Sequence, residues 1–155
     1  MNLEALPRPV GTAPGGPPAT PGLTTLSPSF WKLAKLEELY LQDNNLTSID
    51  QLMDGLANVA HMPALRQLNI NGNEVSALLP ALGDLTSLDG LYASGNRLTS
   101  VSGAALGSLT ALESLHLDNN QLTSLPAEIG GLPLKFLVIT IHRLRPSHPP
   151  ATRRD

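Results

Sequence analysis

The sequence predicts an α/β solenoid, in which short coils of similar sequence stack on one another and share one core. The apolar content is almost entirely aliphatic, because 41% of the 155 residues are hydrophobic but only 3% are aromatic. A core dominated by Leu suits a fold that repeats one packing environment. In addition, a single motif, L-x-x-L-x-L-x-x-N-x-L, fits the chain five times in phase.

The copies of this motif follow one another at similar spacing. Their first residues are 29, 23, 24 and 22 residues apart, and are Leu36, Leu65, Leu88, Leu112 and Leu134. The polar position of the motif holds Asn44, Asn73, Asn96 and Asn120 in the first four copies and His142 in the fifth. This regularity is typical of a repeat protein, in which each coil is one structural unit.

The motif has a direct physical meaning. In x-L-x-L-x the side chains alternate, so the leucines point to one side of a strand. Each coil then has an apolar side that only a neighbouring coil can bury, and the stacked strands form a parallel sheet. The Asn at the turn can satisfy backbone donors and acceptors without burying a charge. His142 cannot fill both roles in one tautomer.

Residues 23–144 therefore resemble the leucine-rich-repeat family, and the stretch LTSLPAEIGGL (122–132) is similar to the intracellular, Ras-group type of repeat. The resemblance implies about five coils, with a parallel sheet on the concave face and helical or 3₁₀ segments on the convex side. Residues 26–33, LSPSFWKL, are interpreted as the back half of a preceding, incomplete coil.

The first full coil is longer than the others, and its extra residues predict a convex helix. Ser48 and Gln51 have capping-box spacing. Apolar residues from Ile49 to Ala60 recur at helical intervals, and Pro63 ends the run. The apolar stripe of this helix is expected to pack on the core.

The two ends of the chain have a different composition from the repeats. Residues 1–22 are rich in Pro and Gly, and residues 145–155 form a Pro-rich tail with a basic end. Both segments are predicted to be disordered. The predicted domain organisation is thus a disordered segment 1–22, a repeat domain 23–144 and a disordered tail 145–155.

Charge and composition exclude several classes of partner. The net charge of −3 argues against direct binding to nucleic acid, which needs a dense basic patch. The absence of Cys excludes disulfides. No apolar run reaches the length of a membrane span, and the N-terminus has no apolar signal-peptide region. These features predict a soluble, cytoplasmic protein.

The exposed strand positions supply the candidate binding residues. They form columns across the predicted sheet, polar and acidic in the first four coils and apolar in the fifth. Tyr side chains suit binding hot spots because they bury a large area at low entropic cost. The candidate partner-binding residues are Glu38, Tyr40, Asn69, Tyr92, His116, Asp118, Phe136 and Val138. The alternative is a solvated sheet face whose charges serve solubility.

Catalysis is not expected. Ser114, His116 and Asp118 share one strand, but they would lie in a row rather than in the geometry of a triad. The sequence contains no phosphate-binding loop and no metal-ligand cluster, so we expect no catalytic residues, no metal and no cofactor.

Three hypotheses for the function follow. The first is a protein-interaction module that holds a basic, partly apolar segment of another protein on its concave face. The second is a small structural subunit of a larger complex, because repeat arrays need caps and none follows Leu144. The third is a fragment of a longer leucine-rich-repeat protein, suggested by the change of composition after Thr140.

Overall fold

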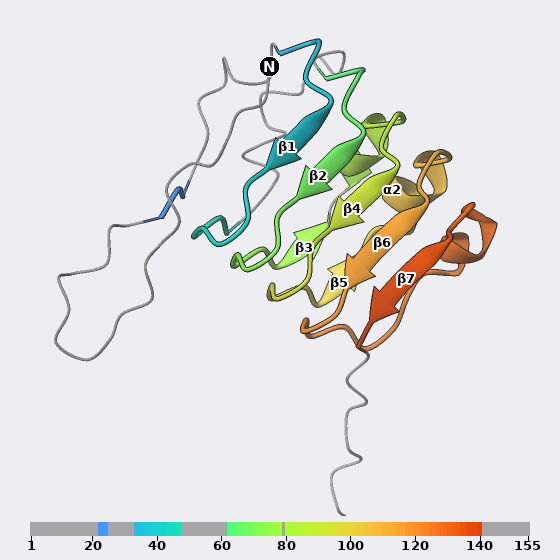
Figure 1. Ribbon diagram of the computed structural model, residues 1–155. Helices are drawn as coiled ribbons and strands as arrows, with labels where there is room; N and C mark the ends of the chain where they lie inside the picture. The colour runs from blue at the N-terminus through green and yellow to red at the C-terminus, as the bar shows by residue number, and fades with distance from the viewer. Residues whose placement is uncertain (1–21, 25–32, 48–61, 79, 141–155) are drawn as a thin grey trace, which may run out of the picture.

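The computed structural model describes residues 22–24, 33–47, 62–78 and 80–140, and these form a stack of short coils around one core. Five strands lie side by side in a parallel sheet, in the order β1-β2-β4-β6-β7 (Figure 1). They are β1 (Glu38–Tyr40), β2 (Gln67–Asn69), β4 (Gly90–Tyr92), β6 (Ser114–Leu117) and β7 (Phe136–Ile139). The chain adds one strand of this sheet per coil, as the motif predicts, so the α/β solenoid is confirmed.

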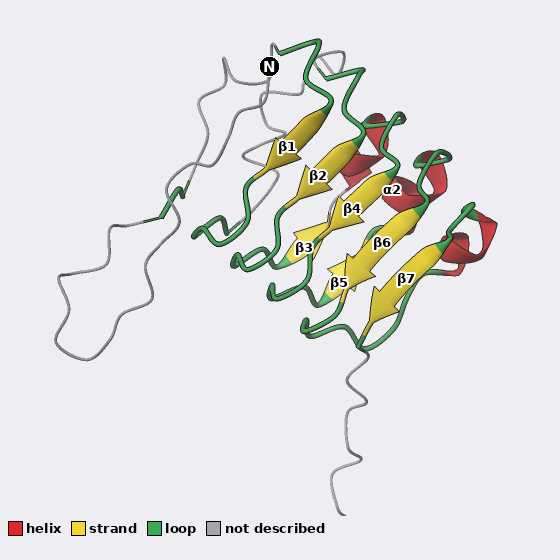
Figure 2. Cartoon of the chain, viewed as in Figure 1, coloured by secondary structure: helices red, strands yellow, loops and turns green. Residues whose placement is uncertain are grey.

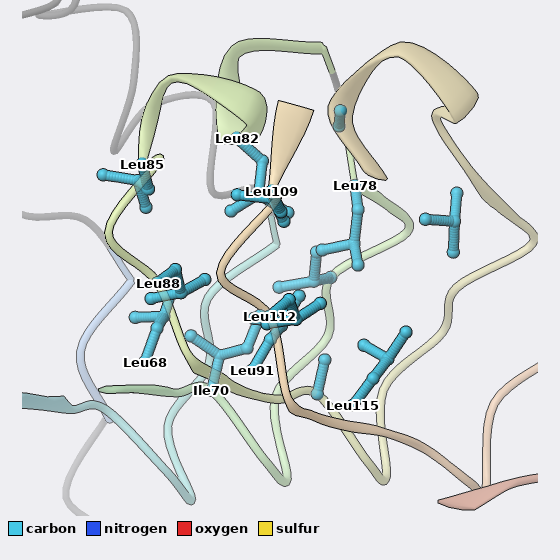
Figure 3. Close-up of a cluster of buried hydrophobic side chains, with 14 of the residues drawn as sticks. Leu68, Ile70, Leu78, Leu82, Leu85, Leu88, Leu91, Leu109, Leu112 and Leu115 are labelled. Atoms are coloured by element: carbon cyan, nitrogen blue, oxygen red, sulfur yellow. The ribbon is translucent and has the colours of Figure 1, made fainter. Parts of the chain in front are cut away.

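The register of the sheet places equivalent motif positions next to one another. Leu39, Leu68, Leu91, Leu115 and Leu137 are consecutive partners across the five strands. In the four strands from β1 to β6 this leucine is at most 4% exposed. The leucines of successive coils pack into one continuous cluster behind the sheet (Figure 3). Each coil therefore buries its apolar side against its neighbours, because a single three- or four-residue strand has no core of its own.

The convex side is built from short helical segments and a second, smaller sheet. The helical segments are η3 (Pro80–Asp84), α2 (Gly103–Ser108) and η4 (Ala127–Gly131). They lie on one side of the five-stranded sheet (Figure 2), as expected for the shorter coils. The pair β3 (Ala77–Leu78) and β5 (Ser100–Val101) forms a parallel two-stranded sheet, which the repeat motif alone did not predict.

Capping and close approach explain where these convex segments lie. The Ser102 side chain caps α2 by accepting a hydrogen bond from the Ala105 backbone N–H at 3.3 Å. Gly83 in η3 faces the same helix, and a Cβ added to it would lie 3.1 Å from Ala105 Cα and 3.0 Å from Ser108 Cβ. Gly at position 83 thus allows η3 and α2 to pack backbone against backbone.

The motif asparagines form a hydrogen-bonded ladder that joins successive coils. Asn96 Nδ2 donates to Ala93 O (3.2 Å) in its own coil and to Ile70 O (2.9 Å) in the preceding coil. Its Oδ1 accepts from Val75 N at 3.0 Å. Asn73 and Asn120 repeat this pattern, and all three are 7% exposed or less. The predicted role of the amide is therefore confirmed in these coils.

The residue before the motif Asn has a left-handed backbone in each of the first four coils. Its φ is +55° at Asp43, +65° at Gly72, +65° at Gly95 and +54° at Asn119. Gly, Asn and Asp tolerate this conformation better than other residues. The turn that follows each strand therefore restricts the sequence at a further position, the one directly before the Asn of the motif.

The stack extends on the N-terminal side beyond the first full motif. Leu23 N donates to Asn44 Oδ1 at 2.9 Å, and Asn45 N donates to Leu23 O at 3.1 Å. Leu46 makes the equivalent two bonds in the next coil. Its N donates to Asn73 Oδ1, and its O accepts from Glu74 N. Leu23 thus occupies the last apolar position of a preceding coil. The stretch 26–33, interpreted as the back half of that coil, lies outside the described residues except for Leu33.

The last strand differs from the other four. Leu137 occupies the inward position of β7, yet it is 45% exposed, and its neighbours Phe136 and Val138 are 62% and 41% exposed. Leu115 has register partners in both β4 and β7, whereas Leu137 has a neighbouring strand on one side only among the described residues. Leu39 in the other end strand, β1, is only 4% exposed, so the exposure of Leu137 reflects the absence of a following coil among the described residues.

Several expectations lie outside the described residues. They are the convex helix after Ser48, the segment 1–21, His142 with the end of the fifth motif, and the tail 145–155. The proposed domain limits therefore stay predictions. In the part of the chain that the structure describes, no helix has the length and apolarity needed to span a bilayer.

Candidate partner-binding surface

The predicted binding residues lie on the sheet face opposite the helical segments, here called the concave face. The register aligns Tyr40, Asn69, Tyr92, His116 and Val138 in one row across all five strands. We call these five residues the central row. Tyr40 and Val138 at its two ends are exposed, and the three residues between them are half-buried.

Two contacts hold the aromatic side chains of the central row. The rings of Tyr92 and His116 meet edge to face, with centroids 5.0 Å apart and planes at 66°. Such aromatic pairs favour this geometry. The Tyr40 hydroxyl donates to Glu38 Oε2 at 3.0 Å. This hydrogen bond to the carboxylate is the main cause that raises the pKa of Tyr40 above its usual value, with burial as the second cause.

A second row of polar side chains runs along the carboxyl ends of the strands. The Ser94 hydroxyl donates to Asp118 Oδ1, and Asn119 Nδ2 donates to Asp118 Oδ2 at 2.7 Å. Ser94 N in turn donates to Asn71 Oδ1 at 2.7 Å. Asp118, a predicted binding residue, is therefore half-buried and already held by two neighbours. Its oxygens are oriented by the protein before any partner arrives.

A shallow groove follows the amino ends of the strands, and the motif alone does not reveal it. It has a volume of about 770 Å³ and is lined by Glu37, Ala64, Arg66, Thr86, Ser87, Asp89, Thr110, Ala111, Glu113 and Pro133. Arg66 pairs with Asp89 at 2.7 Å, and Lys135 pairs with Glu113 at 2.8 Å. The motif places these charged residues in one column, but only the stacking of the coils makes that column the border of a groove.

The ion pairs leave the concave face with an acidic excess on the first coil. Arg66 and Lys135 are each paired to a carboxylate, whereas Glu37 and Glu38 form no ion pair within the described residues. The opposite end of the same face carries Phe136 and Val138 and is apolar. The face thus changes from acidic at β1 to apolar at β7.

The row of Ser114, His116 and Asp118 has no catalytic geometry. Asp118 bonds to Ser94 and Asn119, and His116 packs on Tyr92. No side-chain hydrogen bond joins the three residues in the described part of the chain. Within the same residues, no group of His, Cys, Asp and Glu side chains is arranged to hold a metal ion.

The burial pattern, the Asn ladder and the parallel sheet all match one family. The family described as Leucine Rich repeats (2 copies) matches residues 34–82 and again residues 86–133. The chain belongs to the leucine-rich-repeat family. Proteins of this family are typically interaction modules without enzymatic activity, and their repeats generally mediate protein–protein contacts.

Solved structures of other leucine-rich-repeat proteins are similar to this one. An internalin from Listeria monocytogenes is 29% identical over 75% of this chain, with a TM-score of 0.58. A leucine-rich-repeat protein from Leptospira interrogans is 31% identical over 77% of this chain, with a TM-score of 0.65. A structure described as PEPR1–AtPEP1 is 27% identical over 76% of this chain, with a TM-score of 0.62.

These leucine-rich-repeat structures are much longer than the chain. The chain covers 33% of the internalin, 29% of the Leptospira protein and 16% of the PEPR1–AtPEP1 chain. Among curated proteins, none matches the sequence significantly. The resemblance is therefore one of repeat architecture.

Proposed function

We propose that this protein is an interaction module that binds a segment of another protein on the concave face of its repeats. The observation that carries the proposal is the central row, in which two tyrosines and a histidine are aligned across the sheet at exposed or half-buried positions. Rigid aromatic side chains of this kind dominate the energetics of many protein interfaces. A parallel sheet holds them at fixed spacing.

The charge distribution supports a basic, partly apolar segment as the ligand. Glu37 and Glu38 offer carboxylates at the β1 end, and Phe136 and Val138 offer apolar contacts at the β7 end. A segment lying across the strands would contact the carboxylates at one of its ends and the apolar side chains at the other. Complementary charge then contributes mainly to orientation and association rate.

The same proposal includes the cellular setting. The stretch LTSLPAEIGGL, whose second half contains η4, is similar to the Ras-group type of repeat that occurs inside cells. The chain also contains no Cys, which suits a reducing compartment. We propose a cytoplasmic location on this basis.

Selection from a library of displayed peptides tests the proposal directly. The full chain is immobilised, and selected peptides are measured by fluorescence anisotropy. We expect enrichment of peptides that combine Lys or Arg with apolar residues. Binding should weaken several-fold when the salt concentration rises from about 0.05 to about 0.5 M, since exposed charges are screened.

Matched variants locate the site. Tyr92→Ala and Glu38→Lys should each weaken binding by about tenfold or more. Ser100→Lys adds a positive charge to an exposed residue of β5 on the convex side and should leave binding unchanged. Selected peptides that respond to Ser100→Lys but not to Tyr92→Ala would contradict the proposal.

A second candidate is a structural subunit of a larger assembly, and the observation that favours it is the exposure of β7. An uncovered sheet edge promotes association and aggregation. Thermal unfolding of the isolated chain distinguishes the two candidates. A subunit that depends on its neighbours should melt without cooperativity, whereas an independent module should show one sharp transition.

A further inference from the structure

The last described strand, β7, is apolar and exposed. Three of the five large hydrophobic residues that are exposed among the described residues are Phe136, Leu137 and Val138 on this one strand. Five partly buried apolar residues from η4, from the segments that flank it and from β7 pack against the core, and are Leu125, Ile129, Leu132, Leu134 and Ile139. We call these eight residues the end face. Large exposed apolar side chains that gather on one strand of a folded protein indicate an interaction site.

The backbone of β7 also has groups that face away from β6 and that pair with no other strand among the described residues. Phe136 N donates to Glu113 O at 3.0 Å, so the amide of residue 136 faces β6. In earlier coils the residues at inward positions donate to the next strand, as Ile70 N does to Tyr92 O and Ala93 N does to His116 O. By the same geometry the N–H and C=O groups of Leu137 and Ile139 face the free edge of the sheet. Such an edge pairs readily with another strand.

The two edges of the sheet differ in charge, and this difference indicates what covers β7. At the β1 edge Glu37 and Glu38 are adjacent, so pairing this edge with a copy of itself would bring four carboxylates together. Strand β7 contains no charged residue, and Lys135 before it is neutralised by Glu113 at 2.8 Å. Self-association is therefore opposed at β1 and unopposed at β7.

We propose that the end face binds the end face of a second copy of this chain, through antiparallel pairing of the two β7 strands about a two-fold axis. A register centred on Leu137 lets its outward N–H and C=O bond reciprocally to Leu137 of the partner. Phe136 of each copy then lies beside Val138 of the other on the concave side. All cross-strand pairs within residues 136–138 are apolar in this register, and a two-fold contact closes after two copies.

The tail of the chain is a poorer cover for the same surface. Residues 141–155 contain two large apolar residues, Ile141 and Leu144, against four Arg and three Pro. Pro cannot donate to a strand edge. A second copy instead supplies the same eight apolar side chains that need burial. The contact extends from the strand to η4, which helps it approach the roughly 1,000 Å² that a stable interface requires.

The paired edges would also join two concave faces. The two concave faces would meet where Val138 of each copy lies beside Phe136 of the other, and the acidic β1 ends would lie farthest apart. The dimer would then present two copies of the proposed binding surface on one continuous sheet. A partner with two suitable segments would gain affinity by linkage of the two binding events.

Sedimentation of the full chain over a series of concentrations, without any partner, tests the inference. We expect a species of twice the chain mass of 16.4 kDa that dissociates on dilution and does not grow further. A monomer at all concentrations overturns the inference. If hydrogen exchange shows that β7 is protected in such a monomer, the chain's own tail covers the edge, and the inference is overturned in that case too. Open-ended growth overturns it as well, since it indicates β7 docking on β1.

Two pairs of variants make the test specific. Phe136→Lys should weaken the dimer by about tenfold or more, while Tyr40→Lys, which adds the same charge at the opposite edge, should leave it intact. Leu137→Pro removes the outward N–H and should abolish pairing, whereas Leu137→Ala removes side-chain atoms but keeps that donor and should retain part of it.

Circular dichroism of each variant establishes that the fold is retained. A dimer that survives both Phe136→Lys and Leu137→Pro uses another surface and overturns the inference. Because dimerisation is measured without a ligand, its failure leaves the proposed concave-face binding untouched. Loss of peptide binding by Tyr92→Ala in an intact dimer likewise concerns the proposed function alone.

Discussion

The central coils and the last coil follow the same motif, but they bury it to very different extents. Leu115 in β6 and Leu137 in β7 are register partners, and they are 0% and 45% exposed. The asparagines of the central coils are bonded to two coils each. In a solenoid the environment of a residue is set by the next coil as much as by its own. The same motif position therefore contributes differently to the free energy of unfolding in different coils.

The largest effect should come from truncating the two register-paired leucines. Leu115→Ala creates a cavity in the closed core and should destabilise the fold by about 2–5 kcal/mol. In the monomer, at concentrations below the proposed dimerisation, Leu137→Ala removes a side chain that is partly solvated and should cost less than about 1.5 kcal/mol. Urea unfolding of both variants measures the difference. Equal losses would mean that β7 is as well covered as β6 in solution.

The Asn ladder should show the second largest effect. Asn96→Ala removes the partner of Val75 N and of the Ile70 and Ala93 carbonyls, all of them buried, and should cost about 3 kcal/mol. Gln121→Ala changes an exposed residue of the following coil and serves as control, with a change within about 0.5 kcal/mol. The measurement is the midpoint of denaturant unfolding, compared between variants whose unfolding free energy depends on denaturant concentration with the same slope. A loss below about 1 kcal/mol at Asn96 would show that water replaces the amide.

Glycines on the convex side allow a smaller comparison, between the helical segments η3 and η4. Gly83→Ala places a Cβ against Ala105 and Ser108 of α2 and should cost about 1–3 kcal/mol. Gly130→Ala in η4 meets no atom within 4 Å and should be neutral or stabilising by up to about 1 kcal/mol. Thermal unfolding measures both. A neutral Gly83→Ala would show that η3 can move away from α2.

The smallest predicted effect concerns Tyr40 at the other end of the sheet. Its pKa is raised because its hydroxyl donates to Glu38, so folding favours the neutral phenol. This contribution to stability is complete below the unfolded pKa of about 10 and is lost as pH rises through the folded pKa. Glu38→Gln should lower the pKa of Tyr40, measured by phenolate absorbance in a Tyr92→Phe background. An unchanged titration would show that the hydrogen bond does not persist in solution.

The candidate surface could be predicted from the sequence in part. The motif identifies the outward positions of each strand, and side-chain alternation is enough to place Tyr40, Tyr92 and His116 in one row. It could not show that His116 meets Tyr92 edge to face or that Ser94 holds Asp118. These contacts join residues about 24 positions apart, and their geometry depends on the stacking distance and on rotamers. The groove along the amino ends of the strands was missed for the same reason.

The sequence by itself determined the period of the chain, the position of each strand in the five-stranded sheet, the inward leucines and the buried asparagines. These features follow from side-chain alternation and from the needs of one turn, which are local. Only the tertiary structure decided which convex segments are 3₁₀ or α-helical, where β3 pairs with β5, and which charges meet across strands. It also decided that Leu115 is buried while Leu137 is not. The physical reason is that burial and pairing belong to contacts between coils, and such contacts depend on what each coil has as its neighbour.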